Sequence, residues 1–297
     1  MQLVRVSPES PITLRLARDL VRTLKRGNPW VFADALRARP EAPPGTQAVL
    51  LDNRRGRPVA RGFYDPTSPL AFRACSVEEG TVLDDAWAQQ RFEIAWTLRR
   101  GLFIPDDTTG FRLFNGEGDG LPGLVADVFG DTAVLKLDGP GARGFWTVEG
   151  IAEWLVQKLS VLCVVERFRE RDTAARTLFG PQPEGPVPFL EFGLRFTADV
   201  LHGQKTGFFL DQRENRLRVR GLAGGKSVLD LFGYTGGFSV AAGCGGAKHV
   251  TTVDVAGPAL EAARQHWRLN GLPAGCHQVI EADAFEFLER EIGRAHV

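Results

Sequence analysis

Short apolar runs alternate with amphipathic segments through the last third of the chain, and this pattern predicts strands that alternate with helices. The strands are predicted at residues 227–232, 249–255 and 277–282, and the helices at 211–221, 235–243, 258–270 and 284–290. Asp211, with Glu214 three residues further on, is expected to cap the first helix. Such alternation is typical of a doubly wound α/β sheet, of which three parallel strands form the first half.

The first 190 residues have a different pattern, in which glycine and proline break short apolar runs. Residues 1–76 are predicted to form a small β-barrel, with strands near residues 30–32, 47–52, 59–64 and 70–76 and a helical stretch at 14–26. Residues 77–190 are predicted to form a linker helix at 81–100 and a central α+β domain, with strands at 111–115, 124–129, 133–137 and 161–166, a helix at 146–159 and a polar loop at 167–184. Trp30 and Phe32 are interpreted as core side chains and not as platforms for stacked bases.

Composition narrows the class of protein without naming a function. Hydrophobic residues make up 43% and charged residues 24% of the chain, as in globular proteins, and no run of 18 apolar residues or secretory signal is present. The four cysteines (Cys75, Cys163, Cys244 and Cys276) form no C-x-x-C pair, and the five histidines have no metal-ligand spacing. We therefore expect no metal site and no disulfide, and we expect a cytoplasmic location.

Charge is distributed unevenly along the chain. The first 61 residues carry 12 Lys and Arg against 5 Asp and Glu, a net charge of +7, although the whole chain is neutral. A basic N-terminal module on a neutral protein indicates a polyanionic partner such as nucleic acid. The alternative is a solvated surface that happens to be rich in arginine.

The strand predicted at 227–232 runs directly into a turn that contains glycine, residues 232–237 (FGYTGG), and the next strand ends at Asp254. Glycines allow the backbone to approach a ligand closely, and an acidic side chain at the next strand end can accept hydrogen bonds from ribose hydroxyls. The turn lacks the G-x-G-x-x-G pattern of dinucleotide sites, and the Asp230 carboxylate favours a sulfonium cation over a pyrophosphate. The sequence therefore favours S-adenosylmethionine (SAM) over NAD as the cofactor.

The residues expected to bind this cofactor follow the predicted strands. Those expected around its methionine portion are Asp230, Phe232, Tyr234, Thr235, Gly236 and Gly237. Asp254 is expected to hold the ribose hydroxyls, and Asp283, with Ala284 beside it, to lie near the adenine amino group. Asp283 can also cap the helix that follows it.

Four motifs within residues 10–291 resemble, in the same order, those of bacterial large-subunit ribosomal RNA methyltransferases of the RlmI type. They are residues 28–32 (NPWVF), 116–123 (GEGDGLPG), 202–213 (HGQKTGFFLDQR) and 232–238 (FGYTGGF). The resemblance implies a PUA RNA-binding domain at residues 1–76 and a linker helix with a central α+β domain at 77–190. It also implies the N-terminal half of a Rossmann-like class I SAM methyltransferase domain at 191–291.

The resemblance further implies methylation of cytosine C5 in 23S ribosomal RNA, which needs a cysteine thiolate that adds to C6 of the base. The family places this cysteine after a D-P-P motif that the chain does not contain. None of the four cysteines is expected to replace it, so the catalytic residue is expected beyond the end of this chain and the chain itself is expected to be inactive. The residues implied to flank the cofactor and a flipped base are Lys205, Thr206, Phe209, Asp211, Gln212 and Arg213. No membrane partner is expected, and a homodimer stays open.

The last six residues, 292–297, do not continue the helical pattern. They are expected to be a non-native tail, with native sequence ending near Glu291. The alternative is a natural helix end with Gly293 as its C-cap.

Two other functions stay open at this point. A methyltransferase acting on a nitrogen of guanine or adenine would have the same cofactor half, and a later cysteine would indicate C5 instead. A non-catalytic RNA-binding protein could use the methyltransferase domain as a scaffold. An NAD-dependent oxidoreductase is disfavoured by the sequence of the turn.

Overall fold

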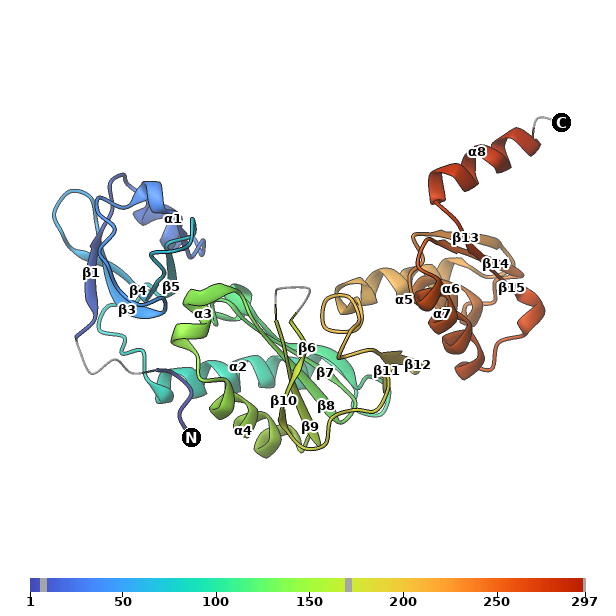
Figure 1. Ribbon diagram of the computed structural model, residues 1–297, viewed down its shortest axis with the longest axis horizontal. Helices are drawn as coiled ribbons and strands as arrows, with labels where there is room; N and C mark the ends of the chain where they lie inside the picture. Colours follow the sequence, from blue (N-terminus) through green and yellow to red (C-terminus); the bar gives the residue numbers. More distant parts are fainter. Residues whose placement is uncertain (6–9, 169–172, 296–297) are drawn as a thin grey trace. The chain divides into compact units, whose positions relative to one another are not determined.

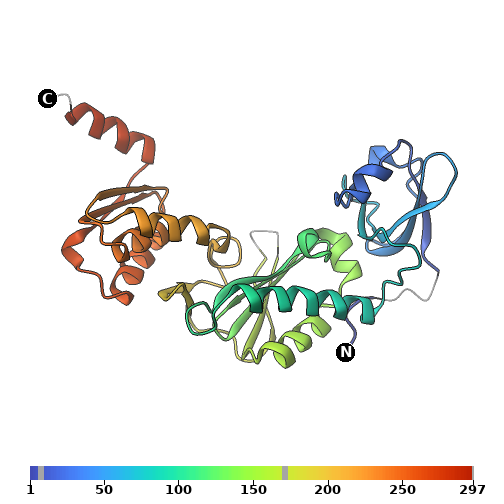
Figure 2. The ribbon, with the colours of Figure 1, turned by 180° about the vertical axis from the view of Figure 1, so that it is seen from behind.

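The computed structural model describes residues 1–5, 10–168 and 173–295, with side chains up to residue 291 (Figures 1 and 2). Its contacts divide the chain into two compact units. Unit 1 consists of Met1–Phe103, Phe111–Glu184 and Val200–His202, and unit 2 of Ile104–Gly110, Gly185–Asp199 and Gly203–Val297. Of the predicted tail, residues 296 and 297 lie outside the described residues. Within the described ranges, no helix is long and apolar enough to cross a membrane.

The N-terminal part of unit 1 is a five-stranded sheet with its own apolar core. In spatial order its strands are β1 (Ile12–Arg15), β3 (Thr46–Leu51), β4 (Pro58–Tyr64), β5 (Phe72–Ser76) and β2 (Trp30–Val31). Leu14, Leu50, Tyr64 and Phe72 are among the buried side chains that form this core. The predicted β-rich module is therefore present, with strands close to the predicted ranges.

Two expectations about this module are wrong. Residues 14–26 do not form one helix, because Leu14 and Leu16 are buried at alternating positions and β1 pairs in parallel with β3. Strand pairing prevails over the helical pattern there, and only α1 (Val21–Lys25) is helical. Trp30 and Phe32 are not core residues, since 45% and 47% of their surfaces are exposed.

The rest of unit 1 is a second five-stranded sheet with helices packed against it. In spatial order the strands are β10 (Arg176–Phe179), β9 (Cys163–Arg167), β8 (Thr132–Leu137), β7 (Leu124–Phe129) and β6 (Gly110–Asn115). Figure 2 shows α2 (Asp85–Leu102) and α4 (Val148–Leu159) along one face of this sheet. The ring of Phe92 in α2 lies 4.5 Å from that of Phe114 in β6 and 5.2 Å from that of Trp154 in α4, so one aromatic cluster joins the three elements.

Several predicted helix details in this region are wrong. Helix α2 begins at Asp85, because Asp84 accepts a hydrogen bond from the Trp87 amide and caps it. Ile94 and Leu98, in the same helix, are half exposed. The helix predicted at 146–159 is present as α4, but α3 (Gly139–Phe145), which precedes it, was not predicted. The polar loop predicted at 167–184 contains β10, which pairs with β9; its residues 169–172 lie outside the described part of the chain.

Two largely buried arginines, Arg73 and Arg99, hold the loop at residues 116–123 in place. Arg99 turns inward, and its guanidinium makes two bonds of 2.7 Å to the carboxylate of Asp119, in the loop at 116–123. Glu117 in the same loop accepts hydrogen bonds from Arg73 (2.6 Å) and from the Trp30 indole (3.1 Å). This glycine-rich loop therefore links α2 with strands β5 and β2 of the N-terminal sheet.

Unit 2 contains a hairpin and a three-stranded parallel sheet. The hairpin strands are β11 (Val187–Glu191) and β12 (Leu194–Ala198). The sheet strands are, in order, β13 (Ser227–Leu231), β14 (His249–Asp254) and β15 (His277–Glu281). The helices are α5 (Arg213–Leu222), α6 (Gly237–Cys244), α7 (Gly257–Leu269) and α8 (Ala284–Ala295). Figure 1 shows α6 and α7 beside one face of the sheet. The predicted alternation of parallel strands and helices is confirmed.

Candidate functional site

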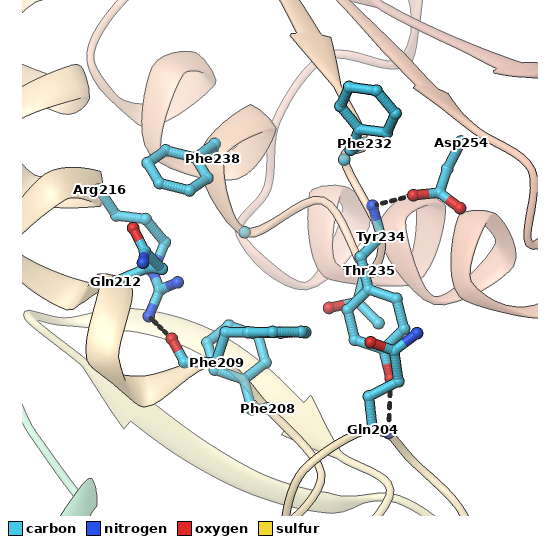
Figure 3. A pocket seen from close by; sticks show the side chains of 12 residues that line it. Gln204, Phe208, Phe209, Gln212, Arg216, Phe232, Tyr234, Thr235, Phe238 and Asp254 are labelled. Carbon is cyan, nitrogen blue, oxygen red and sulfur yellow. Dashed lines mark hydrogen bonds between the residues drawn. The ribbon is translucent and has the colours of Figure 1, made fainter. Parts of the chain in front are cut away.

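A cavity of about 380 Å³ lies where β13 and β14 end and the loop into α6 begins (Figure 3). In an open α/β sheet, the carboxyl ends of the strands are the usual place for a ligand. The cavity is lined by Gln204, Phe208, Phe209, Gln212, Arg216, Phe232, Gly233, Tyr234, Thr235, Gly237, Phe238 and Asp254. Residues that the sequence assigned to a cofactor site are thus brought together here from the 203–212 segment, from the turn after β13 and from the end of β14.

The loop between β13 and α6 has an unusual backbone. Phe232, Tyr234 and Gly236 have positive φ angles of 58°, 47° and 72°. A non-glycine residue in this conformation costs about 1–3 kcal/mol and persists only where its surroundings hold it. Here the Tyr234 amide donates to Asp254 Oδ2 (2.9 Å), and the Gly236 amide donates to the Gly233 carbonyl (2.8 Å). The neighbouring strand end therefore helps to fix the shape of the loop.

Asp254 is held in place by two backbone amides. In addition to the Tyr234 contact, its Oδ1 accepts a hydrogen bond of 2.9 Å from the amide of Ala256. A carboxylate can accept about four hydrogen bonds, so Asp254 retains acceptor capacity. Because its side chain lines the cavity, that capacity is available to hydroxyl groups of a ligand.

Asp230 does not line the cavity and lies at the start of a hydrogen-bond chain. Its Oδ2 accepts from Ser239 Oγ (2.6 Å), which is 2.6 Å from Thr252 Oγ1, which in turn is 2.8 Å from His277 Nε2. Since an ionised carboxylate can only accept, Thr252 donates to Ser239 and His277 donates from Nε2. Burial raises the pKa of Asp230, the charge of Asp254 raises it further, and the bonds from Ser239 oppose this shift.

His266 links the hairpin to the cofactor loop. Its Nε2 accepts a hydrogen bond of 3.0 Å from the Thr197 amide, and its Nδ1 is 2.8 Å from the Thr235 carbonyl. An amide can only donate and a carbonyl can only accept, so Nδ1 carries the proton and the imidazole is neutral. Burial lowers the pKa of His266, which favours the same neutral form.

Arg216, in the middle of α5, is a cavity residue that the sequence predictions missed. Its Nε and Nη2 atoms lie 2.6 and 2.7 Å from the two carboxylate oxygens of Glu191, the last residue of β11. In Figure 3, Arg216 and Phe238 lie on one side of the cavity and Asp254 on the other. Gln212 offered an indication, because residues four apart share one face of a helix. The partner on a distant hairpin could not be inferred.

The predicted residues at 205–213 divide into two groups. Phe209 and Gln212 line the cavity, whereas Lys205, Thr206, Asp211 and Arg213 do not. Lys205 Nζ lies 2.9 Å from both carboxylate oxygens of Asp211 and 4.4 Å from the centre of the Phe209 ring. Lys205 therefore stabilises the segment that carries Phe209.

Asp211 is not the N-cap of α5, and that prediction is wrong. A 3₁₀ turn at Leu210–Gln212 precedes the helix, so the N-cap position falls on Gln212, whose side chain makes no capping bond. The Asp211 carboxylate is instead bound to Lys205. The ion pair thus takes the oxygens that a capping box would have used.

Asp283 and Ala284 lie at the start of α8 and do not line the cavity. Asp283 Oδ1 accepts hydrogen bonds from the amides of Phe285 (2.9 Å) and Glu286 (3.1 Å), which is the geometry of an N-cap. The Phe285 ring lies 5.8 Å from that of Phe232 in the cofactor loop. The start of α8 is therefore adjacent to the cavity without forming its wall.

None of the four cysteines lines the cavity. Burial raises the pKa of the thiols of Cys75, Cys163 and Cys244, which disfavours the reactive thiolate. Among the residues that the structure describes, no cluster of His, Cys, Asp and Glu is suited to hold a metal ion.

Two family models match the chain. The model for S-adenosylmethionine-dependent methyltransferases matches residues 143–291, and the model for the PUA-like domain matches residues 14–76. A "Ribosomal RNA large subunit methyltransferase" of Deinococcus radiodurans is 40% identical over 292 residues, covering 93% of this chain and 71% of that protein. A "Ribosomal RNA large subunit methyltransferase I" of Klebsiella pneumoniae is 35% identical over 288 residues, covering 93% of this chain and 70% of that protein.

Solved structures agree with this assignment. A SAM-dependent methyltransferase from Streptococcus mutans superposes with a TM-score of 0.83 over 96% of this chain and 74% of that chain, at 24% identity, and shows the fold. A methyltransferase complexed with S-adenosylhomocysteine (SAH) gives the same TM-score over 96% of this chain and 73% of that one, at 25% identity. The predicted PUA-like domain and methyltransferase fold are confirmed. The comparisons lend no support to the expected truncation, which stays a prediction, as does the non-native tail.

Proposed function

Because the chain belongs to the SAM-dependent methyltransferases of large-subunit ribosomal RNA, we propose that its cavity binds SAM and that the methyl acceptor is cytosine C5 of 23S ribosomal RNA. SAM is the cofactor of this family and supplies an electrophilic methyl group when bound. The chain's own residues then have to bind the cofactor, orient it and admit an unstacked base. Unpaired RNA makes that unstacking less costly.

The observation that carries the proposal is the position of Asp254 opposite the FGYTGG turn, with both held by the same hydrogen bond. We assign the ribose hydroxyls to Asp254, and the methionine portion to the turn. The residues of that turn proposed to contact the cofactor are Phe232, Tyr234, Thr235 and Gly237, and Gly236 is proposed to shape the turn from behind. Asp230 would act from beneath the turn, through Ser239. Asp283 and Ala284 would meet the adenine end, which the contact of Phe285 with Phe232 supports.

The choice of cytosine C5 rests on the family resemblance and makes a demand on the chain. The reaction needs a thiolate that adds to C6 of the base before the methyl group is transferred, and a base that then removes the C5 proton. No cysteine of the chain lines the cavity. We therefore propose that these 297 residues bind the cofactor but do not carry out the transfer.

Methylation of a base nitrogen is a second candidate, and the same observation favours it. A nitrogen nucleophile needs no cysteine, so a cavity without a thiol suits that chemistry without a further residue. The nitrogen candidate predicts a methylated purine in the RNA, whereas the C5 candidate predicts no product from this chain.

The RNA would be recognised chiefly by the basic N-terminal domain. Its half-exposed Trp30 and Phe32 are available to a partner, and the first 61 residues carry the net charge of +7. The proposal also includes three domains, at residues 1–76, 77–190 and 191–291, and a cytoplasmic location. It includes a homodimer as well, which analytical ultracentrifugation would test.

Isothermal titration calorimetry with SAH tests the cofactor site. We expect binding by the unaltered chain and a 10- to 100-fold weaker affinity for Asp254→Asn, from loss of about 1.5–3 kcal/mol of charge-assisted hydrogen bonding. Asp34→Asn in unit 1 is the matched control, because that aspartate is exposed and bound only to Arg18 in its described contacts. Equal affinities for Asp254→Asn and the unaltered chain would refute the ribose assignment.

Transfer of a tritiated methyl group from SAM to undermethylated 23S ribosomal RNA tests the second part of the proposal. We expect no transfer by this chain under conditions in which the Deinococcus radiodurans relative is active. Turnover by this chain that yields 5-methylcytidine would show that a residue within the 297 acts as nucleophile, and a methylated purine would establish the nitrogen candidate.

A further inference from the structure

Arg216 uses only part of its hydrogen-bonding capacity inside the protein. A guanidinium has five N–H donors in a fixed plane. Nε and Nη2 donate to the two oxygens of Glu191, and Nη2 also donates to the Phe209 carbonyl at 3.0 Å. Within the described part of the chain, no hydrogen-bond partner of Nη1 is found, although Arg216 is only 3% exposed. Two donors of a nearly buried cation therefore remain for a ligand.

The surroundings of Arg216 hold these donors at the cavity. The guanidinium carbon lies 4.7 Å from the centre of the Phe208 ring and 5.9 Å from that of Phe238, and both rings line the same cavity as Arg216. Glu191 holds the opposite edge through two bonds, so the guanidinium plane cannot rotate without breaking them.

Gly237 keeps the approach to Nη1 open. A Cβ at this position would lie 3.2 Å from Arg216 Cδ, 3.3 Å from Phe208 Cζ and 3.6 Å from Arg216 Nη1. Gly237 is also the first residue of α6, and its N-cap, Gly236, has no side chain that could accept from the first amides. A helix N-terminus and a buried arginine edge thus meet at one point of the cavity, and both favour an anionic group.

We propose that Nη1 of Arg216 binds the carboxylate of the amino-acid tail of SAM. The inference rests on the proposed cofactor site and adds to it a residue for the end of the cofactor far from the ribose. Arg216 and Asp254 lie on opposite sides of the cavity (Figure 3), which suits a ligand with a carboxylate at one end and hydroxyls towards the other. Because Glu191 already neutralises Arg216, the remaining donors select by geometry as well as by charge.

A pair of ligands tests this assignment by calorimetry. SAH is compared with its decarboxylated analogue S-adenosyl-3-thiopropylamine, and 5′-methylthioadenosine, which lacks the whole tail, reports on the adenosine end alone. For the unaltered chain we expect SAH to bind about 30-fold more tightly than the decarboxylated analogue, as for the loss of one charged hydrogen-bonded pair.

The protein side of the test uses two variants. Arg216→Lys keeps the charge that balances Glu191 but has no second planar edge. The double variant Arg216→Gln, Glu191→Gln removes both charges together, so that no buried charge is left alone if the lysine variant is unstable. In both we expect the preference for SAH to fall below about threefold, with the affinity for 5′-methylthioadenosine unchanged within about twofold.

Arg220→Lys is the matched control. Arg220 lies one turn further along α5, donates to the Phe192 carbonyl at 3.1 Å and does not line the cavity, so the preference for SAH should persist. The assignment is overturned if the Arg216 variants retain the preference or if the unaltered chain has none. If the unaltered chain binds SAH and the decarboxylated analogue with equal affinity, the partner of Nη1 would be another anion, such as an RNA phosphate. Failure of all three ligands to bind would refute the proposed cofactor site itself.

Discussion

At Gly236, backbone conformation and close packing both exclude a side chain. Its φ is 72°, and a Cβ there would lie 2.7 Å from the Cβ and 3.1 Å from the Cα of Ala263 in α7. The glycine therefore allows α7 to approach the loop that follows β13. The sequence indicated a close approach by a ligand at this turn, and the structure adds a close approach by a helix.

Gly236→Ala should be considerably more destabilising than a similar substitution without the contact. Gly225 has a φ of 69° and nothing within 4 Å of its built Cβ, so Gly225→Ala isolates the backbone cost of about 1 kcal/mol. For Gly236→Ala we expect the free energy of unfolding to fall by about 3 kcal/mol, because the clash with Ala263 adds to the backbone cost. Urea denaturation of both variants gives the comparison. Equal losses would mean that α7 yields without cost.

His277 should make unit 2 sensitive to acid. Burial lowers its pKa to about 4, and the charges of Arg264 and His249 act in the same direction. Because the unfolded chain has a histidine pKa near 6.5, it binds the proton first, and stability falls as the pH falls from about 6.5 to about 4. Between pH 7 and pH 5 the free energy of unfolding should therefore fall in the unaltered chain. In His277→Gln we expect that fall to be smaller by about 1 kcal/mol. Parallel urea profiles at the two pH values would contradict this.

At the scale of elements, the β11–β12 hairpin is fastened to unit 2 by polar side chains. Glu191 binds Arg216 in α5, Thr197 binds His266 in α7, and the Arg195 amide donates to the Asn270 side chain at 2.9 Å. Each contact joins the hairpin to a different point of the sheet's helical layer. Through Glu191 the hairpin thereby positions Arg216, which lines one side of the cavity.

Removing Glu191 should loosen this fastening. Glu191→Ala leaves Arg216 buried without its counter-charge, and we expect the free energy of unfolding to fall by about 3–5 kcal/mol. Glu261→Ala is the control, because Glu261 contacts Arg264 and Arg268 on an exposed helix surface, where a pair contributes less than about 1 kcal/mol. Denaturation midpoints that shift equally in the two variants would show that the buried pair has no special role.

Strands and helices with strong local patterns were predictable, whereas tertiary pairings were not. The alternation from Ser227 to Glu281 follows from apolar periodicity, and every strand and helix predicted there is present. Arg99 and Arg216 turn inward because each forms an ion pair with a carboxylate on another element, Asp119 and Glu191. No local sequence pattern indicates these pairs. The helix predicted at 14–26 failed for the same reason, since pairing with β3 is a long-range contact.

The candidate site was predictable to the extent that it lies in continuous motifs. The turn after β13 and the end of β14 supply cavity residues that the strand pattern located. Asp230 and Gly236 are in those motifs but support the loop from behind, which spacing along the chain does not distinguish from contact. Arg216 lies outside every motif, so only the folded structure assigns it to the cavity.

At the scale of the whole molecule, the division into two units predicts separable unfolding. The proposed cofactor site lies wholly in unit 2. A ligand stabilises only the part that binds it, by about 2.7 kcal/mol at a concentration 100 times its dissociation constant. We expect SAH to raise the midpoint temperature of one transition in scanning calorimetry and to leave the other unchanged. In Asp254→Asn the same SAH concentration should give a clearly smaller shift, because the affinity is weaker. Joint movement of both transitions would mean that the units unfold together.

The path of the chain through unit 2 also determines the order in which its parts can fold during translation. Residues 104–110 belong to unit 2, yet 74 residues of unit 1 follow before unit 2 resumes at residue 185, just ahead of the hairpin. The hairpin cannot make its contacts with unit 2 until later residues have been translated. His266, the partner of Thr197, follows it by 69 residues, and Asn270, the partner of Arg195, follows it by 75. Unit 1 can close while the ribosome is still extending the chain, but the cofactor-binding half cannot be complete until α7 has emerged.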